Sequence, residues 1–135
     1  MHFRTTVESA LETRLKALYA PAIEVREKGL YPIVENERQI IWDIEEDVLT
    51  QQDADENVRE LKILLTVFAP TKAEREAIIV DVDADLTVNP PGGLLLWRLD
   101  RVSYGIQTME ESLLFGAEME YRGSVCVKTG DLTGS

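Results

Sequence analysis

The sequence has few of the residues that catalysis and metal binding usually need. It contains a single histidine, His2, and a single cysteine, Cys126. A catalytic nucleophile needs a base within hydrogen-bond reach, and His2 lies beside the start methionine, where we expect a solvated terminus. We therefore predict that the protein is not an enzyme and requires no metal or other cofactor. One cysteine excludes an intrachain disulfide and favours a reducing compartment, and we predict Cys126 to be a small apolar filler in a strand.

Long apolar runs are also missing. No stretch approaches the roughly 20 residues that cross a bilayer, and the charged sequence that begins at Arg4 lacks the apolar segment of a signal peptide. We expect a soluble protein with no membrane partner.

Basic residues are scarce, since 14 Lys and Arg stand against 25 Asp and Glu and give a formal net charge of −11. Binding to phosphate backbones depends on Lys and Arg that displace counterions, so we predict no sequence-specific nucleic-acid binding. At 135 residues, with 44% hydrophobic and 29% charged side chains, the composition indicates one globular domain over residues 1–135.

The first predicted element is a helix over residues 5–19. Thr5 and Glu8 have the spacing of a capping box, and Pro21 stops the helix. Its buried stripe follows helical spacing: Val7, Ala10, Leu11, Leu15, Leu18 and Tyr19. Residues 22–34 give a mixed signal, in which Gly29 and Pro32 interrupt short apolar runs that could be a strand and a turn.

Two strands follow and could pair as an antiparallel hairpin. Ile40, Trp42 and Ile44 alternate with other residues in a predicted strand over 38–48. Residues 50–57 are polar and acidic and are predicted to be a mobile hairpin loop.

The second strand of this hairpin has two unlike faces. One face is apolar and comprises Leu61, Ile63, Leu65 and Val67; the other comprises Glu60, Lys62, Leu64, Thr66 and Phe68. Leu64 and Phe68 predict that the second face is also partly covered, either by a helix or by another subunit.

Residues 71–89 allow two interpretations. Apolar residues from Val80 to Val88 alternate as in a strand, whereas the capping box formed by Thr71 and Glu74 and the helix formers up to Ala77 favour a helix. We predict a helix, with a strand over 78–88 as the alternative.

The segment Pro90-Pro91-Gly92-Gly93 breaks this element, because proline removes a donor and glycine supplies positive φ. Strands over 98–107 and 115–122 are then predicted to pair across a turn at 108–112, and residues 128–135 form a flexible tail. The predicted fold is α+β: one domain with a mixed, mostly antiparallel sheet packed with two helices.

Several acidic groups imitate functional motifs incompletely. Asp81, Asp83 and Asp85 match the start of a calcium loop, but Leu86 stands where glycine is needed and Gly92 where a glutamate belongs. We interpret them as a solvated acidic face. The pairs Glu45-Glu46 and Glu110-Glu111 could be glycosidase carboxylates, but we predict solvated strand ends. The Pro-Pro-Gly-Gly segment is not a phosphate-binding loop.

The order of elements resembles that of the tail terminator and tail completion proteins of long-tailed phages. The resemblance spans most of the chain and is carried by residues 58–70 leading into the capped helix, by the sequence Pro90-Pro91-Gly92-Gly93-Leu94, and by the sequence Gly116-Ala117-Glu118-Met119-Glu120-Tyr121-Arg122. The chain departs from the family pattern around residues 30–41, where the apolar second strand is interrupted by polar residues.

The resemblance implies a structural role. Such proteins form a ring, commonly a hexamer, that caps the tail tube and joins it to the head, so a tail tube protein and a head-tail connector are the implied partners. The implied location is the virion tail, or the host cytoplasm during assembly, for a phage or a prophage. An excess of negative charge suits a ring through which DNA passes without being gripped.

A ring needs two different surface patches that meet head to tail. Leu64 and Phe68 are the candidate for one, and Glu118, Glu120 and Arg122 for the other. If Leu64 and Phe68 contact a neighbour, serine at both should abolish the ring and leave a folded monomer. Two alternatives stay open: an acidic interaction module that mimics DNA or sequesters a basic protein, and a small enzyme that acts through carboxylates.

Overall fold

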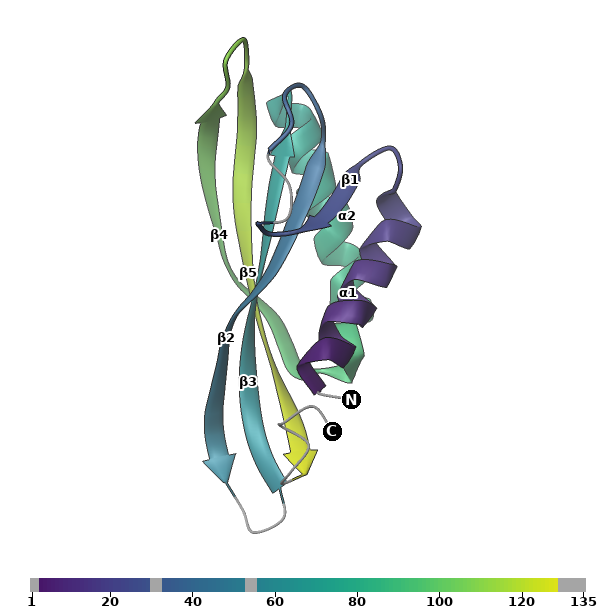
Figure 1. Cartoon of the computed structure of the whole chain (residues 1–135), viewed down its shortest axis with the longest axis vertical. Coiled ribbons are helices and arrows are strands. Elements are labelled where there is room, and N and C mark those ends of the chain that lie inside the picture. Colours follow the sequence, from purple (N-terminus) through teal and green to yellow (C-terminus); the bar gives the residue numbers. More distant parts are fainter. Residues whose placement is uncertain (1–2, 30–32, 53–55, 129–135) are drawn as a thin grey trace.

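Two helices pack on one face of a five-stranded sheet in the computed structural model, which describes residues 3–29, 33–52 and 56–128 (Figure 1). The elements in chain order are α1 (Phe3–Tyr19), β1 (Glu24–Glu27), β2 (Gln39–Gln52), β3 (Glu56–Ala69), α2 (Lys72–Val88), a 3₁₀ turn η1 (Pro91–Gly93), β4 (Leu95–Thr108) and β5 (Leu113–Lys128). The predicted α+β class with two helices and a mixed, mostly antiparallel sheet is confirmed.

The strands lie in the order β1-β2-β3-β5-β4, so β5 lies between β3 and the edge strand β4. Only β1 and β2 are parallel, and β1 covers no more of β2 than Gln39 to Trp42. The hairpins β2-β3 and β4-β5 extend to opposite ends of the sheet (Figure 1). The two sheet edges are therefore the short β1, continued by the uncovered part of β2, and the long β4.

The core lies between the helices and the apolar face of the sheet. It includes Val7, Leu11 and Leu15 of α1, Ile78, Val82 and Leu86 of α2, and Leu61, Ile63, Leu65 and Val67 of β3. The predicted apolar face of β3 is thus confirmed. Tyr121 of β5 is 1% exposed, stacks on Trp97 with ring centroids 4.8 Å apart, and donates a 2.9 Å hydrogen bond to Asp83 of α2. This contact ties β5 to the helix layer.

The predicted start of the first helix is wrong. The helix begins at Phe3, so Thr5 lies within the first turn instead of capping it, and Glu8 forms an i,i+4 ion pair with Arg4 at 3.6 Å. The helix ends before Pro21 as predicted. Leu18 belongs to the predicted buried stripe of this helix but is 45% exposed. In the last turn of the helix it borders only a shallow hollow, which α1 shares with the C-terminal end of α2.

The first hairpin is longer than predicted. β2 extends to Gln52 and β3 begins at Glu56, so most of the predicted loop is paired strand; residues 53–55 lie outside the described residues. Polar side chains do not end a hairpin ladder, since its hydrogen bonds are made by the backbone, and Thr50 Oγ1 adds a 3.0 Å hydrogen bond to the carbonyl of Val58. β1 occupies part of the segment that gave a mixed signal.

The helix over residues 71–89 is confirmed, and the alternative strand over 78–88 is wrong. Thr71 is the N-cap of α2, and its hydroxyl accepts a 3.2 Å hydrogen bond from the backbone N–H of Glu74. The same hydroxyl donates to the Glu74 carboxylate at 3.0 Å. The cap between two residues only three positions apart therefore predicted this element better than the apolar alternation, which favoured a strand.

Replacing Thr71 with alanine removes this cap, and we expect the free energy of unfolding to fall by about 1 kcal/mol. Chemical denaturation would measure the loss. Thr71→Ser keeps the accepting hydroxyl and serves as the control, so an equal loss for both variants would contradict the capping role.

The break at residues 90–93 and the closing hairpin are confirmed. Gly92 has φ 63°, and the turn of the hairpin is closed by a 2.8 Å hydrogen bond from the N–H of Met109 to the carbonyl of Ser112. Both strands are longer than predicted. Lys128, the first residue of the predicted flexible tail, is the last residue of β5, and residues 129–135 lie outside the described residues, as does His2.

Two predictions about polar and small residues are wrong. Cys126 is exposed, because it points to the face of β5 that no helix covers and pairs with Val58 near the end of the sheet. Glu45 and Glu46 lie within β2 at a register shift and not at its end, and both carboxylates approach Lys62 Nζ, at 4.0 and 3.9 Å. Glu110 and Glu111 are exposed at the turn between β4 and β5.

Two tyrosines make the fold sensitive to alkali. Burial, followed by the nearby Asp81 and Asp85 carboxylates, raises the pKa of Tyr19 to about 12. Burial and the hydrogen bond to Asp83 raise the pKa of Tyr121 as well. Since both folded pKa values exceed the unfolded value of about 10, stability is unaffected below pH 10 and falls as the pH rises from 10 towards them.

We therefore expect the denaturation midpoint to decrease steadily above pH 10, as tyrosinate forms in the unfolded chain. Denaturation monitored over that range, together with tyrosinate absorbance, would measure this. The double variant Tyr19→Phe, Tyr121→Phe should have a flatter dependence on pH, and an unchanged slope would contradict the assignment.

Candidate functional site

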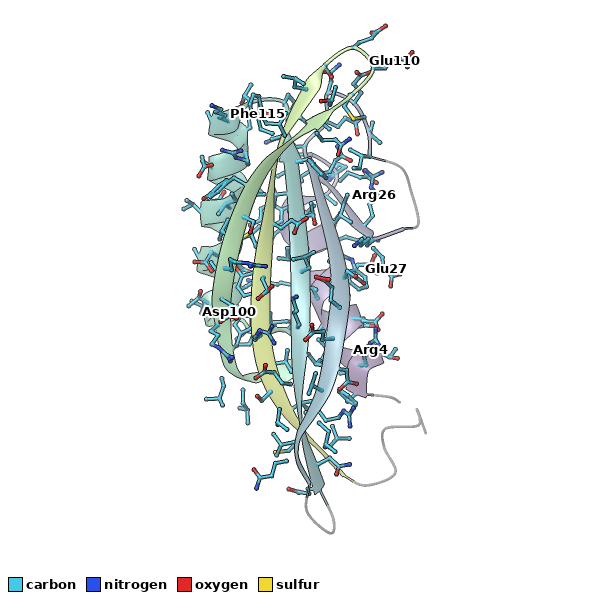
Figure 2. All side chains as sticks on the ribbon, turned by 90° about the vertical axis from the view of Figure 1, so that its left-hand side faces the viewer. Arg4, Arg26, Glu27, Asp100, Glu110 and Phe115 are labelled. Atoms are coloured by element: carbon cyan, nitrogen blue, oxygen red, sulfur yellow. The ribbon has the colours of Figure 1, made fainter. Side chains whose placement is uncertain are left out.

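The candidate site is the open face, which we define as the side of the β2-β3-β5-β4 sheet that no helix covers (Figure 2). All five residues predicted as interface residues lie on it: Leu64, Phe68, Glu118, Glu120 and Arg122. In the register of β3 and β5, Leu64 is opposite Glu120, Lys62 opposite Arg122, and Thr66 opposite Glu118. The two predicted patches therefore form one continuous surface, and the interface role of these residues stays a prediction.

One half of the open face is a network of ion pairs. Lys62 Nζ lies 3.2 Å from Glu120 Oε1, and the Arg122 guanidinium binds Glu60 and Asp100, each at 3.0 Å. These hydrogen bonds, that of Glu60 first, raise the pKa of Arg122. Glu120 is only 8% exposed and has a second cationic neighbour, since Arg101 lies 3.5 Å from it. The acids of this half therefore have cationic partners within the chain.

The other half is apolar. Ile33, Ile41, Leu64 and Phe68 line a hollow of about 470 Å³, whose rim includes Thr66, Glu118 and the residues from Arg26 to Gly29. We call this the Phe68 hollow. Leu64 is 8% exposed at its floor. The prediction that this face could be covered by a helix is wrong, because α2 packs on the opposite face. Arg26 and Glu27 of β1 line the same hollow as Leu64.

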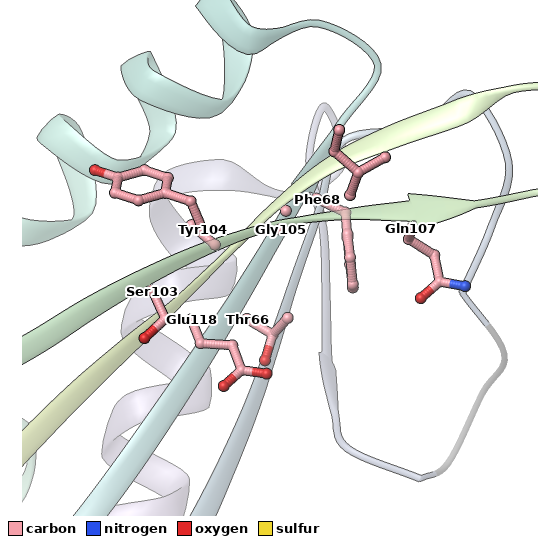
Figure 3. Close-up of a pocket in the computed structure, with 10 residues that line it drawn as sticks. Thr66, Phe68, Ser103, Tyr104, Gly105, Gln107 and Glu118 are labelled. Atoms are coloured by element: carbon pink, nitrogen blue, oxygen red, sulfur yellow. The ribbon is translucent and has the colours of Figure 1, made fainter.

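A second, smaller hollow of about 290 Å³ lies beyond Phe68 (Figure 3). Thr66, Ser103 and Glu118 border it, whereas Tyr104 points to the other side of the strands, where the Arg75 guanidinium lies 4.8 Å from its ring centroid.

Two glycines create this hollow. Gly105 and Gly116 are cross-strand partners, and a Cβ on Gly116 would lie 2.8 Å from Cε1 of Phe68, so the Phe68 ring lies directly on the strand backbone. A Cβ on Gly105 would meet nothing within 4 Å. Glycine inside a strand often marks such a close approach. One of these two glycines lies in each predicted strand, so the pair is the sequence signal that indicates this hollow.

Sequence reasoning also missed an apolar projection at the start of β4. Leu95 is 61% exposed and Leu96 is 77% exposed, although the preceding Leu94 is buried. Leu96 has φ 52°, a conformation that costs a non-glycine residue about 1 kcal/mol or more. The ladder to β5 is irregular here, with register shifts on both sides of Arg98. We call this pair of residues the Leu95–Leu96 knob.

The acidic groups of the described residues form no metal site. Over residues 3–29, 33–52 and 56–128, no group of three or more His, Cys, Asp or Glu side chains is placed to hold a metal ion. Asp83 accepts a hydrogen bond from the Tyr121 hydroxyl. Asp85 accepts a 3.0 Å hydrogen bond from Nε of Arg14, and this contact lowers the pKa of Asp85.

Comparisons with known proteins add no family. The chain matches no protein-family model, and its sequence matches no curated protein. In the part of the chain that the structure describes, no helix is long and apolar enough to span a membrane.

Proposed function

We propose that the protein is a structural ring subunit of the tail terminator or tail completion type, in a phage or prophage tail. The observation that carries the proposal is the open face: both helices lie on one side of the sheet, and no helix of the described residues covers the other side, which holds the apolar Phe68 hollow and a paired charge network. A sheet face of this kind is used in assembly, where neighbouring copies and a tail tube cover the remaining surface.

The charge balance supports the same role. A ring through which genomic DNA passes should not hold the DNA, and a net charge of −11 opposes contact with phosphates. In this proposal the ring is a hexamer of identical chains, its partners are the tail tube protein and the head-tail connector, and it is assembled in the host cytoplasm and retained in the virion tail.

The acidic interaction module remains the rival. The net charge is the only feature that supports this rival. On the open face the carboxylates are in ion pairs with cations of the same chain, which are Lys62, Arg101 and Arg122. A DNA mimic would instead present acids that are free to meet a basic partner. This surface therefore favours the structural role.

Light scattering coupled to size-exclusion chromatography, over a range of concentrations and with added tail tubes, tests the proposal. We expect a closed assembly with the mass of six 15.2 kDa chains, and rings at one end of the tubes in negative-stain images. A chain that stays monomeric at millimolar concentration and on tail tubes would overturn the ring. Tight binding of basic proteins by that monomer would support the acidic module.

A further inference from the structure

We propose that the edge of β4 between Val102 and Thr108 is a docking site for an extended strand of a different polypeptide, which places a tyrosine opposite Gly105. The site combines two features: outward backbone groups along this edge and the hollow of about 290 Å³ beside it. The inference goes beyond the proposed ring and does not depend on it.

Backbone hydrogen-bonding groups point away from the sheet along this part of β4, which is the outermost strand (Figure 1). The N–H of Met109 donates to the carbonyl of Ser112, so these two residues form a hydrogen-bonded pair at the end of the β4-β5 ladder. Such pairs alternate along an antiparallel ladder, and the register is regular over this stretch. The backbone of Gly105 is therefore bonded to β5. The backbone groups of Tyr104 and Ile106 point outwards, where no described strand lies.

This edge lacks the features that keep sheet edges from binding further strands. Residues 102–108 contain no charged residue and no proline, and Tyr104 and Ile106 are 58% and 60% exposed. The other free edge, which belongs to β2, has two register shifts and four acidic residues: Asp43, Glu45, Glu46 and Asp47. Charges and bulges of this kind prevent strand addition, whereas an unprotected edge favours it.

The hollow next to this edge has room for one side chain of an added strand. Gly105 leaves the space above it empty, since a Cβ there would meet nothing within 4 Å (Figure 3). Phe68 borders the hollow, and so does Glu118, which is exposed and has no ion pair among the described side chains.

A residue opposite Gly105 in an added strand would form a non-hydrogen-bonded pair, in which facing side chains lie closest. An aromatic ring at this position covers the glycine. A tyrosine ring would contact Phe68, and its hydroxyl would donate to the Glu118 carboxylate. The lining of the hollow thus selects an aromatic side chain with a polar tip.

The free strand edges of this chain do not match the site. The uncovered part of β2 contains no aromatic residue, and pairing of two β4 strands about Gly105 would place glycine against glycine and leave the hollow empty. We therefore assign the occupant to a different polypeptide. Its residues beside Tyr104 and Ile106 should be apolar, because these two side chains expose apolar surface on the helix side of the strand.

Peptide binding to the intact chain, measured by calorimetry, tests the site. The probe is the capped peptide Thr-Thr-Val-Tyr-Val-Thr-Thr, whose tyrosine can lie opposite Gly105 with its valines beside Tyr104 and Ile106. We expect it to bind, with a dissociation constant at least about tenfold lower than that of the same peptide with alanine at its centre. A peptide that is N-methylated at both valines lacks the paired donors and should not bind.

Variants of the protein separate backbone pairing from side-chain contact. Ile106→Pro removes an outward N–H without removing a bond to β5, so peptide binding should be lost. Ile106→Thr is the matched control, because it loses the same side chain but keeps the N–H, and it should still bind. Gly105→Val fills the hollow and should keep its denaturation midpoint, since its Cβ has free space. This variant should lose the preference for tyrosine over alanine.

A tyrosine peptide that fails to bind at millimolar concentration overturns the site, as does binding that Ile106→Pro or N-methylation leaves unchanged. Equal affinities of the tyrosine and alanine peptides overturn the role of the hollow. If the chain forms a ring without peptide and Ile106→Pro abolishes it, another copy occupies this edge, and the assignment to a different polypeptide is wrong. A chain that binds the peptide but never forms a ring overturns the ring alone.

Discussion

Leu64→Ser should lower the free energy of unfolding by about 3 kcal/mol, within the range of 2 to 5 kcal/mol for truncating a large buried aliphatic side chain. Leu64 is 8% exposed between Asp43 and Glu120, its cross-strand neighbours in β2 and β5. Serine would remove most of this apolar contact and add a hydroxyl at the floor of the hollow. Equilibrium denaturation in urea would measure the loss.

This expected loss replaces the earlier expectation that Leu64 and Phe68 can become serine without harm to the monomer. Leu113→Ser is a suitable control, because Leu113 is 48% exposed at the start of β5 and should lose less than about 1 kcal/mol. A Leu64 variant that keeps its denaturation midpoint but loses self-association would restore Leu64 as an interface residue.

Sequence periodicity predicted the first helix and the two faces of β3 because those features depend on local geometry. In a strand, successive side chains alternate between faces, so Leu61 and Leu65 had to point away from Lys62. The cap at Thr71 is equally local, since its hydroxyl reaches the N–H only three residues further along the chain. Such contacts can be predicted without knowing the rest of the fold.

The candidate site was harder to predict because it depends on pairing between distant strands. Nothing in the sequence places β5 between β3 and β4, yet this order brings Glu120 beside Lys62 and Glu118 beside Thr66. The two groups of residues, separated by about 50 positions, therefore became one surface. The same pairing explains why the lone cysteine is exposed: the alternation places it on the open face, where no helix packs.

The exposure of Leu96 was also beyond sequence reasoning. The run Leu94-Leu95-Leu96 suggests a buried start of a strand, but the turn at Gly92 and Gly93 and the shifted ladder leave only the first leucine in the core. A positive φ at a leucine cannot be inferred from residue type, since it is imposed by the packing around it.

Lys62→Met should cost about 2 to 3 kcal/mol, because it leaves the buried Glu120 carboxylate without its closest cation. The side chains of Lys62 and Glu120 are 17% and 10% exposed, and their charged atoms are 3.2 Å apart. The expected loss lies below that for a wholly unpaired buried charge, because Arg101 and Arg122 remain at 3.5 and 3.8 Å from the carboxylate. Chemical denaturation at low and high salt would measure it, and the loss should change little with salt because a buried pair is weakly screened.

A double-mutant cycle separates the ion pair from the packing of the two stems. Glu120→Met in the Lys62→Met background removes the stranded carboxylate, so the double variant should recover most of the lost stability. Equal and additive losses would mean that Lys62 stabilises the sheet through its methylene groups alone. A large coupling energy would mean that the acids of the open face are held by cations of the same chain.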